Sequence, residues 1–252
     1  IGLSVMDTQA SAITFLSTPG LAFDSGMLFV QNYFGMPLAL ILIAVVFVPM
    51  YYKLNVSSVY EFLEHRFDSK TRTLGSTLFL IQRSFSAGIT IYAPSIILTS
   101  VLGWDMNTTV IGVGLAVIIY TVTGGNHAVS VTHRYQMTVI LSGMAVAFGI
   151  VVYKISNHAG FVENLSVAGA LGHLNVIDFS FDLNKRYTLW SGLLGGFFLH
   201  LSYFGTDQSQ AQRYISGNSV RDSRLGLMFN ALLKVPMQFM ILFLGVLVFV
   251  FY

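Results

Sequence analysis

Seven stretches of the chain are long and apolar enough to cross a bilayer. Hydrophobic residues dominate each stretch, while charged and polar residues collect in the connections between them. A membrane-spanning helix needs about 20 mostly apolar residues. The pattern therefore predicts seven spanning helices, at roughly 2–22, 33–52, 74–101, 107–123, 136–154, 187–206 and 225–251.

The composition agrees with this pattern. Of the 252 residues, 54% are hydrophobic and 10% are charged, whereas about 25% are charged in a soluble domain. The net charge of +2 gives no basic surface for nucleic acid, and the absence of cysteine excludes disulfides and thiolate metal sites within this sequence. We expect an all-α polytopic membrane protein in which residues 1–252 form a single transmembrane domain.

Four polar connections separate the segments, and their basic residues predict the orientation. Within the first, Ser58 and Glu61 fit a capping box that opens a short amphipathic helix. A weak helix is expected at 161–171. If all seven segments span, eight Lys and Arg residues lie in the connections 53–73, 124–135 and 207–224, against three on the other side. Because cytoplasmic loops carry the excess of Lys and Arg, these three connections are predicted to be cytoplasmic.

Both ends of the sequence lie within apolar runs. Ile1 is neither an initiator methionine nor part of a basic signal-peptide region, and Tyr252 follows directly on the last apolar segment. We therefore expect this chain to be a piece of a longer protein.

The first segment carries polar residues that a helix exposed to lipid would not tolerate. Asp7, Ser11 and Thr14 follow a spacing that places them on one helical face. An ionised Asp near the bilayer centre costs about 2.5–3.5 kcal/mol even on the insertion scale. Two interpretations remain open: a cation and solute site at a discontinuous helix, or a structural Asp bonded to a neighbouring helix.

The sixth segment combines flexibility with polar side chains. Gly195 and Gly196 lie in its middle, and His200 and Tyr203 follow on one face. Glycine lowers the cost of unwinding a helix, and a glycine-interrupted helix beside a polar one is typical of transporter sites. Close helix packing at small residues is the alternative.

Other polar positions within the segments have weaker interpretations. Asn32 and Tyr33 open the second segment and fit either an interface or a site. Ser86 in the third segment faces the same way as Thr90, one turn later. Arg83 and Lys234 are interpreted as side chains that snorkel towards the membrane surface, with an ion pair as the alternative for Lys234.

Motifs of common enzyme classes are absent from the sequence. It contains no HExxH, GxSxG, Walker or CxxC pattern, and its six histidines are scattered. His127 and His133 are the closest pair, but six residues is not a tight spacing for metal ligands. We therefore expect neither an enzyme nor a transition-metal site.

Three stretches resemble the sodium/solute symporter family. IIYTVTGGNHAVSVTHRYQ (118–136) is similar to the junction between its fourth and fifth core helices, and GTDQSQAQRYISGNSVRDSRLG (205–226) to the loop after its sixth. DTQASAITFLSTPG (7–20) resembles its first core helix. The run YAPSIIL (92–98) is nearer the iodide, multivitamin and monocarboxylate branch, with its bacterial relatives, than the sugar branch.

The resemblance implies a leucine-transporter-type fold of five plus five inverted-repeat helices, of which this chain supplies core helices one to seven. The remaining transporter helices would be absent from the chain. Na⁺ is implied as the coupling ion, with no organic cofactor. By resemblance, Asp7 and Ala10 mark the first-helix half of a sodium site. Asp7 departs from the small residue common in relatives, and His133 stands where many relatives have an Asp, which puts a second sodium ion in doubt.

A solute pocket is also implied by the resemblance. It would involve Ser11, Thr14, Asn32, Tyr33, Ser86, His200 and Tyr203, the last as an aromatic inner gate. Sugars are disfavoured because relatives that carry them have an acid and amides at such positions. Sialic acid is disfavoured because its symporters have an arginine where Ser86 stands.

The function expected from these observations is Na⁺-coupled symport of a small organic solute or anion by alternating access. The protein would be a multi-pass protein of the plasma membrane whose partners are the solute and the lipid bilayer, with no nucleic acid. Three alternatives remain: the membrane sensor domain of a symporter-like sensor kinase, a channel, and a structural membrane subunit.

Overall fold

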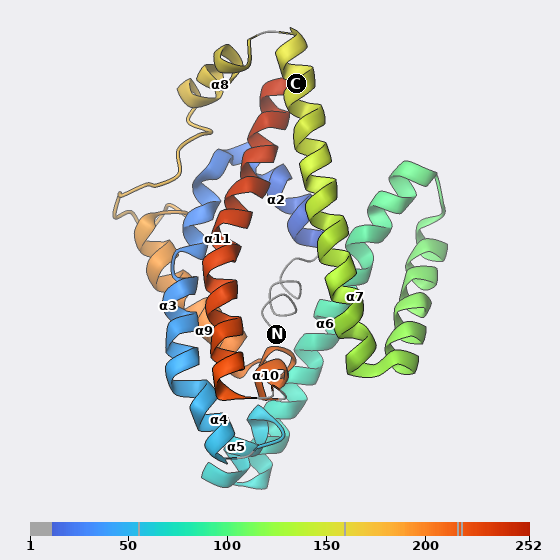
Figure 1. Ribbon diagram of the computed structural model, residues 1–252, viewed down its shortest axis with the longest axis vertical. Helices are drawn as coiled ribbons and strands as arrows, with labels where there is room; N and C mark the ends of the chain where they lie inside the picture. Colours follow the sequence, from blue (N-terminus) through green and yellow to red (C-terminus); the bar gives the residue numbers. More distant parts are fainter. Residues whose placement is uncertain (1–11, 55, 159, 216, 218) are drawn as a thin grey trace.

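The computed structural model describes residues 12–54, 56–158, 160–215, 217 and 219–252, with side chains at all of these except 12, 13, 125–130, 133, 134 and 158. Every regular element in these ranges is a helix (Figure 1). Five stretches are long and apolar enough to cross a membrane, namely Thr14–Leu54, Ser69–Leu102, Met106–Gly124, Tyr135–Asn157 and Val220–Phe251.

The first of these stretches reverses direction and so contains two of the predicted segments. Its elements are α2 (Ala12–Ser25), the 3₁₀ helix η1 (Gly26–Tyr33), α3 (Met36–Leu42), the π-helical turn η2 (Ile43–Phe47) and α4 (Val48–Leu54). Gly26 makes the reversal at a positive φ of 74°. A Cβ there would lie 2.7 Å from the His173 backbone. Figure 1 shows α2 in the upper part of the molecule and the α3–α4 run descending at the left.

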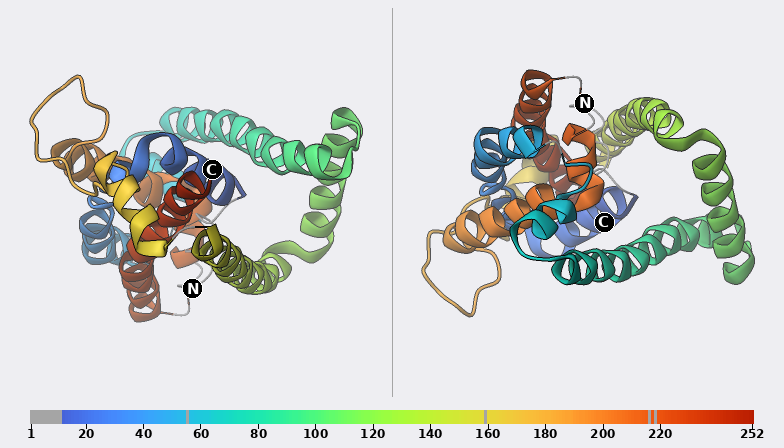
Figure 2. Two further views of the ribbon diagram at one scale, coloured as in Figure 1. Left: turned by 90° about the horizontal axis from the view of Figure 1, so that it is seen from above. Right: turned by 90° about the horizontal axis from the view of Figure 1, so that it is seen from below.

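The middle of the chain forms α5 (Val59–Arg66), α6 (Ser69–Leu102), α7 (Met106–His158) and α8 (Phe161–Ala170). The predicted capping residue Ser58 accepts a hydrogen bond on Oγ from the Glu61 backbone N–H, at 3.2 Å. The helical run of α7 contains both the fourth and fifth predicted segments, and it turns back between them. Figure 2 shows α6 and the first part of α7 as an arm that leads away from the bundle.

The last part of the chain contains η3 (Ser191–Gly195, π-helical), α9 (Gly196–Thr206), α10 (Gln208–Ile215) and α11 (Val220–Phe251). The sixth predicted segment is present as η3 and α9, but it is shorter than the five candidate spans. The connections predicted to be cytoplasmic all lie towards one end of the molecule, the lower end in Figure 1.

The long helix α11 is the centre of the bundle. It contacts α2, η1, α3, the returning part of α7 and α8. Its ring contacts include Phe243 with Phe148 of α7, with centroids 6.0 Å apart, and Phe249 with Phe23 of α2, at 5.6 Å. Gly245 lets α11 approach the α2 backbone, because a Cβ there would lie 2.2 Å from the Pro19 carbonyl oxygen.

Glycines also bring η3 and α9 into backbone contact with η1 and α3, along what we call the glycine seam. A Cβ on Gly192 would lie 2.2 Å from the Gln31 carbonyl oxygen, and one on Gly196 would lie 2.5 Å from that of Asn32. Gly35 completes the seam, since its Cβ would lie 2.2 Å from the Phe197 backbone nitrogen. A side chain at any of these three positions would overlap the partner backbone, so glycine is needed for the two backbones to approach this closely.

The helix of the sixth segment is not unwound at Gly195 and Gly196, although it departs from regular α-helix just before them. The chain forms one widened π-helical turn, η3, and continues as regular helix from Gly196 to Thr206. Of the two interpretations offered by the sequence, the structure shows close packing at Gly196, while the position of a Cβ on Gly195 has no atom within 4 Å.

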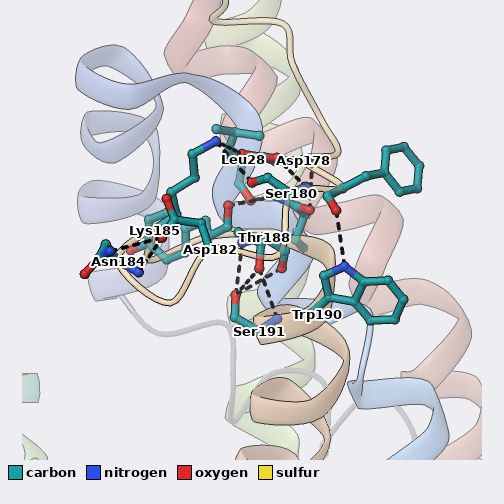
Figure 3. Close-up of polar contacts among 12 residues, drawn as sticks. Leu28, Asp178, Ser180, Asp182, Asn184, Lys185, Thr188, Trp190 and Ser191 are labelled. Atoms are coloured by element: carbon teal, nitrogen blue, oxygen red, sulfur yellow. Dashed lines mark hydrogen bonds and ion pairs between the residues drawn. The ribbon is translucent and has the colours of Figure 1, made fainter.

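The connection before η3 is fastened to η1 through Gln31, whose side chain is fully buried. The Gln31 amide oxygen accepts a hydrogen bond from the Asp178 N–H at 3.0 Å, and its Nε2 donates to the Tyr187 carbonyl oxygen at 3.3 Å. The Asp178 carboxylate in turn accepts bonds from Lys185 Nζ and the Ser180 N–H, both at 2.8 Å (Figure 3). Residues far apart in sequence thus hold η1 in place.

The bonds from Lys185 and Ser180 lower the pKa of Asp178 from its usual 3.8 to about 2. A carboxyl whose folded pKa is depressed stabilises the fold above its unfolded pKa, and this contribution disappears as the pH falls through the folded value. The fastening of this connection is therefore complete above about pH 4 and lost towards pH 2.

We expect Gly192→Ala to destabilise the protein by about 1–3 kcal/mol, because overpacking against a fixed backbone has costs of this size. Thermal unfolding in detergent measures the effect. Gly195→Ala is the matched control, because it adds the same methyl group to the same turn where nothing lies within 4 Å. Equal melting temperatures for the two variants would contradict the packing described here.

We expect Asp178→Asn to loosen the connection at neutral pH. Trp190 reports on it, since its Nε1 donates a hydrogen bond to the Phe179 carbonyl oxygen at 3.2 Å. In a Trp104→Phe background, which leaves one of the two tryptophans, Trp190 emission should stay constant down to about pH 4 and shift to the red towards pH 2. Asp178→Asn should be shifted at every pH. Asp182→Asn is the control, and identical spectra for the two variants would refute the expectation.

Candidate functional site

The glycine seam places two predicted site residues face to face. Tyr33 ends η1, His200 lies in the second turn of α9, and their ring centroids are 5.7 Å apart. Phe29 packs edge-on against the far side of Tyr33, at 5.8 Å. Tyr33 is half-buried and His200 is 6% exposed. A pair of aromatic rings with polar edges therefore stands at the contact between the second and sixth predicted segments.

His200 has a fixed orientation. Its Nδ1 lies 2.7 Å from the Gly196 carbonyl oxygen, which is the backbone group one turn earlier in α9. The Phe204 ring also stacks against it, with centroids 6.3 Å apart. A ring held at one nitrogen and in contact with two aromatic rings presents its remaining nitrogen in one direction, as a positioned hydrogen-bonding group.

Lys234 of α11 adds a buried charge next to this pair. Its side chain is only 1% exposed, and its charge lies within electrostatic reach of His200. The interpretation of Lys234 as a side chain that snorkels to the surface is therefore wrong. The packing of α11 against α2 and η1 keeps this part of the helix inside the bundle.

Below His200, polar contacts close the end of the bundle that is predicted to be cytoplasmic, which we call the inner end. The Tyr203 hydroxyl accepts a hydrogen bond from Gln210 Nε2 at 3.0 Å, so α9 is joined to α10. Tyr51 of α4 donates a bond to the Gly205 carbonyl oxygen at 2.6 Å. The role of Tyr203 as an inner gate remains a prediction.

An ion pair joins α6 to the same end. Arg83 lies 3.7 Å from the Asp207 carboxylate, and it also donates a hydrogen bond to Ser209. Asp207 is buried at 8% side-chain exposure, and a buried carboxylate needs a charged partner. The Arg83 side chain remains 34% exposed and extends to residues of the connection predicted to be cytoplasmic, so the interpretation that it snorkels stays a prediction, with an ion pair at its end. We refer to Tyr51, Arg83, Tyr203, Asp207 and Gln210 as the inner closure.

The structure brings some of the predicted site residues together and leaves others apart or undescribed. Asn32, Tyr33, His200 and Tyr203 come together along the seam and below it. Thr14 lies at the start of α2, and Ser86 lies in the middle of α6, one turn above Arg83. The helices α2 and α6 contact each other, so these two residues are located by their helices rather than by the glycine seam. Asp7, Ala10 and Ser11 lie outside the described residues, as does the side chain of His133.

No transition-metal site is seen in the part of the chain that the structure describes, where no three His, Cys, Asp or Glu residues meet in a way that could hold a metal ion. This result does not test the prediction that Asp7 and Ala10 bind sodium, because neither residue is described. Na⁺ would in any case be transported cargo, bound by oxygen atoms of side chains and backbone.

Sequence reasoning missed the polar face of α11. Asn230, Lys234 and Gln238 are all buried and recur every four residues, so they share one helical face. The four-residue spacing is the feature of the sequence that predicts this polar face. It was overlooked because each residue stands alone within an apolar run.

The chain is similar to a family of known proteins. The family model of the Sodium:solute symporter family matches residues 1–252. The human sodium/iodide cotransporter is 32% identical over 252 residues, which are 100% of this chain and 39% of that protein. The human sodium-coupled monocarboxylate transporter 1 is 34% identical over 230 residues, 91% of this chain and 37% of the relative. The chain thus spans less than half the length of these curated relatives.

A solved structure shows the same fold. It is the substrate-bound, outward-open state of a Na⁺-coupled sialic acid symporter, which matches with a TM-score of 0.89 and 27% sequence identity. The match covers 100% of this chain and 53% of the other. The expected fold class, an incomplete all-α transporter fold, is therefore confirmed, and all three of these relatives are named as transporters.

A family match over the full chain, an identity above 30% and a shared fold agree with the apolar spans. They make the chain a multi-pass protein of the plasma membrane, and it belongs to the sodium:solute symporter family.

Proposed function

We propose that this chain forms core helices one to seven of a secondary active transporter that couples Na⁺ entry to uptake of a small organic solute or anion by alternating access. The observation that carries the proposal is the contact between the half-buried Tyr33 and the buried His200, above the inner closure. Aromatic rings with a few positioned polar groups are typical of small-molecule sites. We propose no bond-making chemistry and no organic cofactor.

Access to such a site requires that its two ends open in turn. The inner closure joins α4, α6, α9 and α10 by bonds that a relative movement of these helices would break. We propose that Na⁺ favours the state with this end closed, so that solute enters from outside. Release would follow when the Arg83–Asp207 pair and the Tyr203–Gln210 bond separate. A ligand shifts such an equilibrium only by its differential affinity for the two states.

Lys234 supports an anionic solute. An ammonium group has three N–H donors, so Lys234 can contact a solute in addition to protein groups. Its burial strengthens electrostatic interactions relative to water. Asp7 and Ala10 remain our proposal for the first-helix part of the sodium site, and Ser11, Thr14, Asn32 and Ser86 for further solute contacts.

The sensor-kinase alternative gains no support, because the three relatives are named as a cotransporter, a transporter and a symporter. A channel is disfavoured by the inner closure, which seals one end with several hydrogen bonds and an ion pair. A purely structural subunit would have no use for a buried lysine beside a fixed histidine, because such a charge is costly to bury.

We expect the full-length protein in proteoliposomes to accumulate a solute only when a Na⁺ gradient is present. A panel of monocarboxylates, vitamins, iodide, sugars and amino acids identifies the solute, with K⁺ in place of Na⁺ as the control. Asp7→Asn should weaken the Na⁺ activation of uptake. Uptake that is equally fast in Na⁺ and K⁺ for every solute would refute the proposal.

We expect Lys234→Met to raise the KM for an anionic solute about tenfold or more, because a hydrogen bond to a charged group contributes about 1.5–3 kcal/mol and about 1.4 kcal/mol is tenfold. Initial uptake rates across solute concentrations measure the change. Lys154→Met is the control, because Lys154 lies over the Phe251 ring, 5.2 Å from its centroid and outside the proposed site. An unchanged KM in Lys234→Met would show that the lysine does not contact the solute.

A further inference from the structure

Buried polar atoms without partners are concentrated along α11. Asn230 and Gln238 have no solvent exposure, and in the described structure neither the oxygen nor the nitrogen of either side-chain amide has a hydrogen-bond partner. A buried amide without a partner costs roughly 2–7 kcal/mol, depending on the reference state. In a bilayer no solvent is available to remove this cost. Two such amides on one helix therefore require an explanation.

The two amides lie on either side of Lys234, on the same face of α11. The spacing 230, 234, 238 corresponds to about 12 Å along the helix axis, at about 1.5 Å per residue. Because α11 begins at Val220, next to the connection predicted to be cytoplasmic, Asn230 lies on the inner side of Lys234 and Gln238 on the outer side. The polar face thus extends in both directions from the proposed solute site.

Further unpartnered atoms lie on the inner side. Tyr214 Oη and Gln210 Oε1 of α10 are buried and have no hydrogen-bond partner in the described structure. Tyr214 belongs to the same buried cluster as Leu227 and Ala231, which flank Asn230 on α11. Burial also raises the pKa of Tyr214 well above its ordinary value, so its hydroxyl stays protonated. Amide and hydroxyl groups of this kind are what a bound water requires, at two to four partners per water.

We propose that Asn230 and Gln238 line the route of the solute and Na⁺ through the protein, and that water entering this route satisfies their amides in turn. Gln238 is hydrated when the site opens to the outside, and Asn230 when the inner closure opens. This inference rests on the proposed function, and it adds two residues that neither the family resemblance nor the seam identifies.

A purely structural role would predict a different arrangement. Amides that hold helices together make hydrogen bonds across the interface, whereas these two make none in the described structure. Replacement of an unpartnered amide by an apolar side chain of similar size is neutral or stabilising when the site is always dry. The two possibilities therefore differ in both accessibility and the effect of substitution.

Cysteine accessibility tests the proposal, because this chain contains no cysteine of its own. Asn230→Cys and Gln238→Cys are made singly in the full-length transporter, with any cysteines elsewhere replaced, and are treated with a membrane-impermeant thiosulfonate from each side. We expect Gln238→Cys to react from outside about tenfold faster with Na⁺ than without it. Asn230→Cys should react from inside and about tenfold more slowly with Na⁺.

Leu232→Cys is the matched control, because Leu232 lies on the exposed face of the same helix at 72% exposure. Its reactivity should not depend on Na⁺. If Asn230→Cys and Gln238→Cys are unreactive from both sides, or if Na⁺ changes them no more than Leu232→Cys, the proposal is overturned. Na⁺-driven uptake with unreactive cysteines defeats this inference alone, whereas side-specific reactivity without Na⁺-driven uptake defeats the proposed function.

Asn230→Leu and Gln238→Leu provide a second measurement that does not depend on labelling. If water reaches these amides, each variant should lower the initial uptake rate about tenfold without lowering the melting temperature. Unchanged uptake together with a raised melting temperature would show that the amides are permanently dry, and the proposal would be wrong.

Discussion

The site depends on one contact, the backbone-to-backbone packing of η3 and α9 against η1 and α3. Gly192, Gly196 and Gly35 allow it, because any larger side chain would overlap a carbonyl or amide group of the partner helix. At this separation the Tyr33 and His200 rings meet directly. Helices held at an ordinary spacing of about 8–10 Å by larger residues would leave these rings apart. The glycines therefore decide whether a site exists here.

Polar contacts at both ends maintain this packing. On the outer side, the buried Gln31 amide fastens η1 to the connection before η3, and Asp178 and Lys185 hold that connection together. On the inner side, Arg83 and Asp207 join α6 to the end of α9. Both networks provide hydrogen bonds and ion pairs to polar groups that lipid could not bind, but the two networks differ in function. The outer network positions η1, while the inner closure consists of a few bonds that can separate when the helices move.

Much of the fold could be predicted from hydrophobic periodicity, because span length and apolarity are properties of single segments. Ser58, Glu61 and the helix near 161–171 were also predictable, since capping and short helices are local. The site was less accessible to such reasoning. Gly195 and Gly196 were expected to break a helix, but whether a glycine unwinds or packs depends on its neighbours. Lys234 was expected to snorkel but is buried, because a sequence pattern does not show which face of a helix is covered. Tyr33, His200 and Tyr203 stood out as polar positions within the segments, and the family resemblance assigned them to a solute pocket, whereas neither source identified Asn230 or Gln238.

The most direct test of the proposed site is a structure of the full-length protein with Na⁺ and its transported solute. We expect the solute to lie against the Tyr33 and His200 rings, within hydrogen-bond distance of Lys234 and above the inner closure. A solute bound elsewhere, with Tyr33 and His200 still packed against each other, would contradict the proposed site.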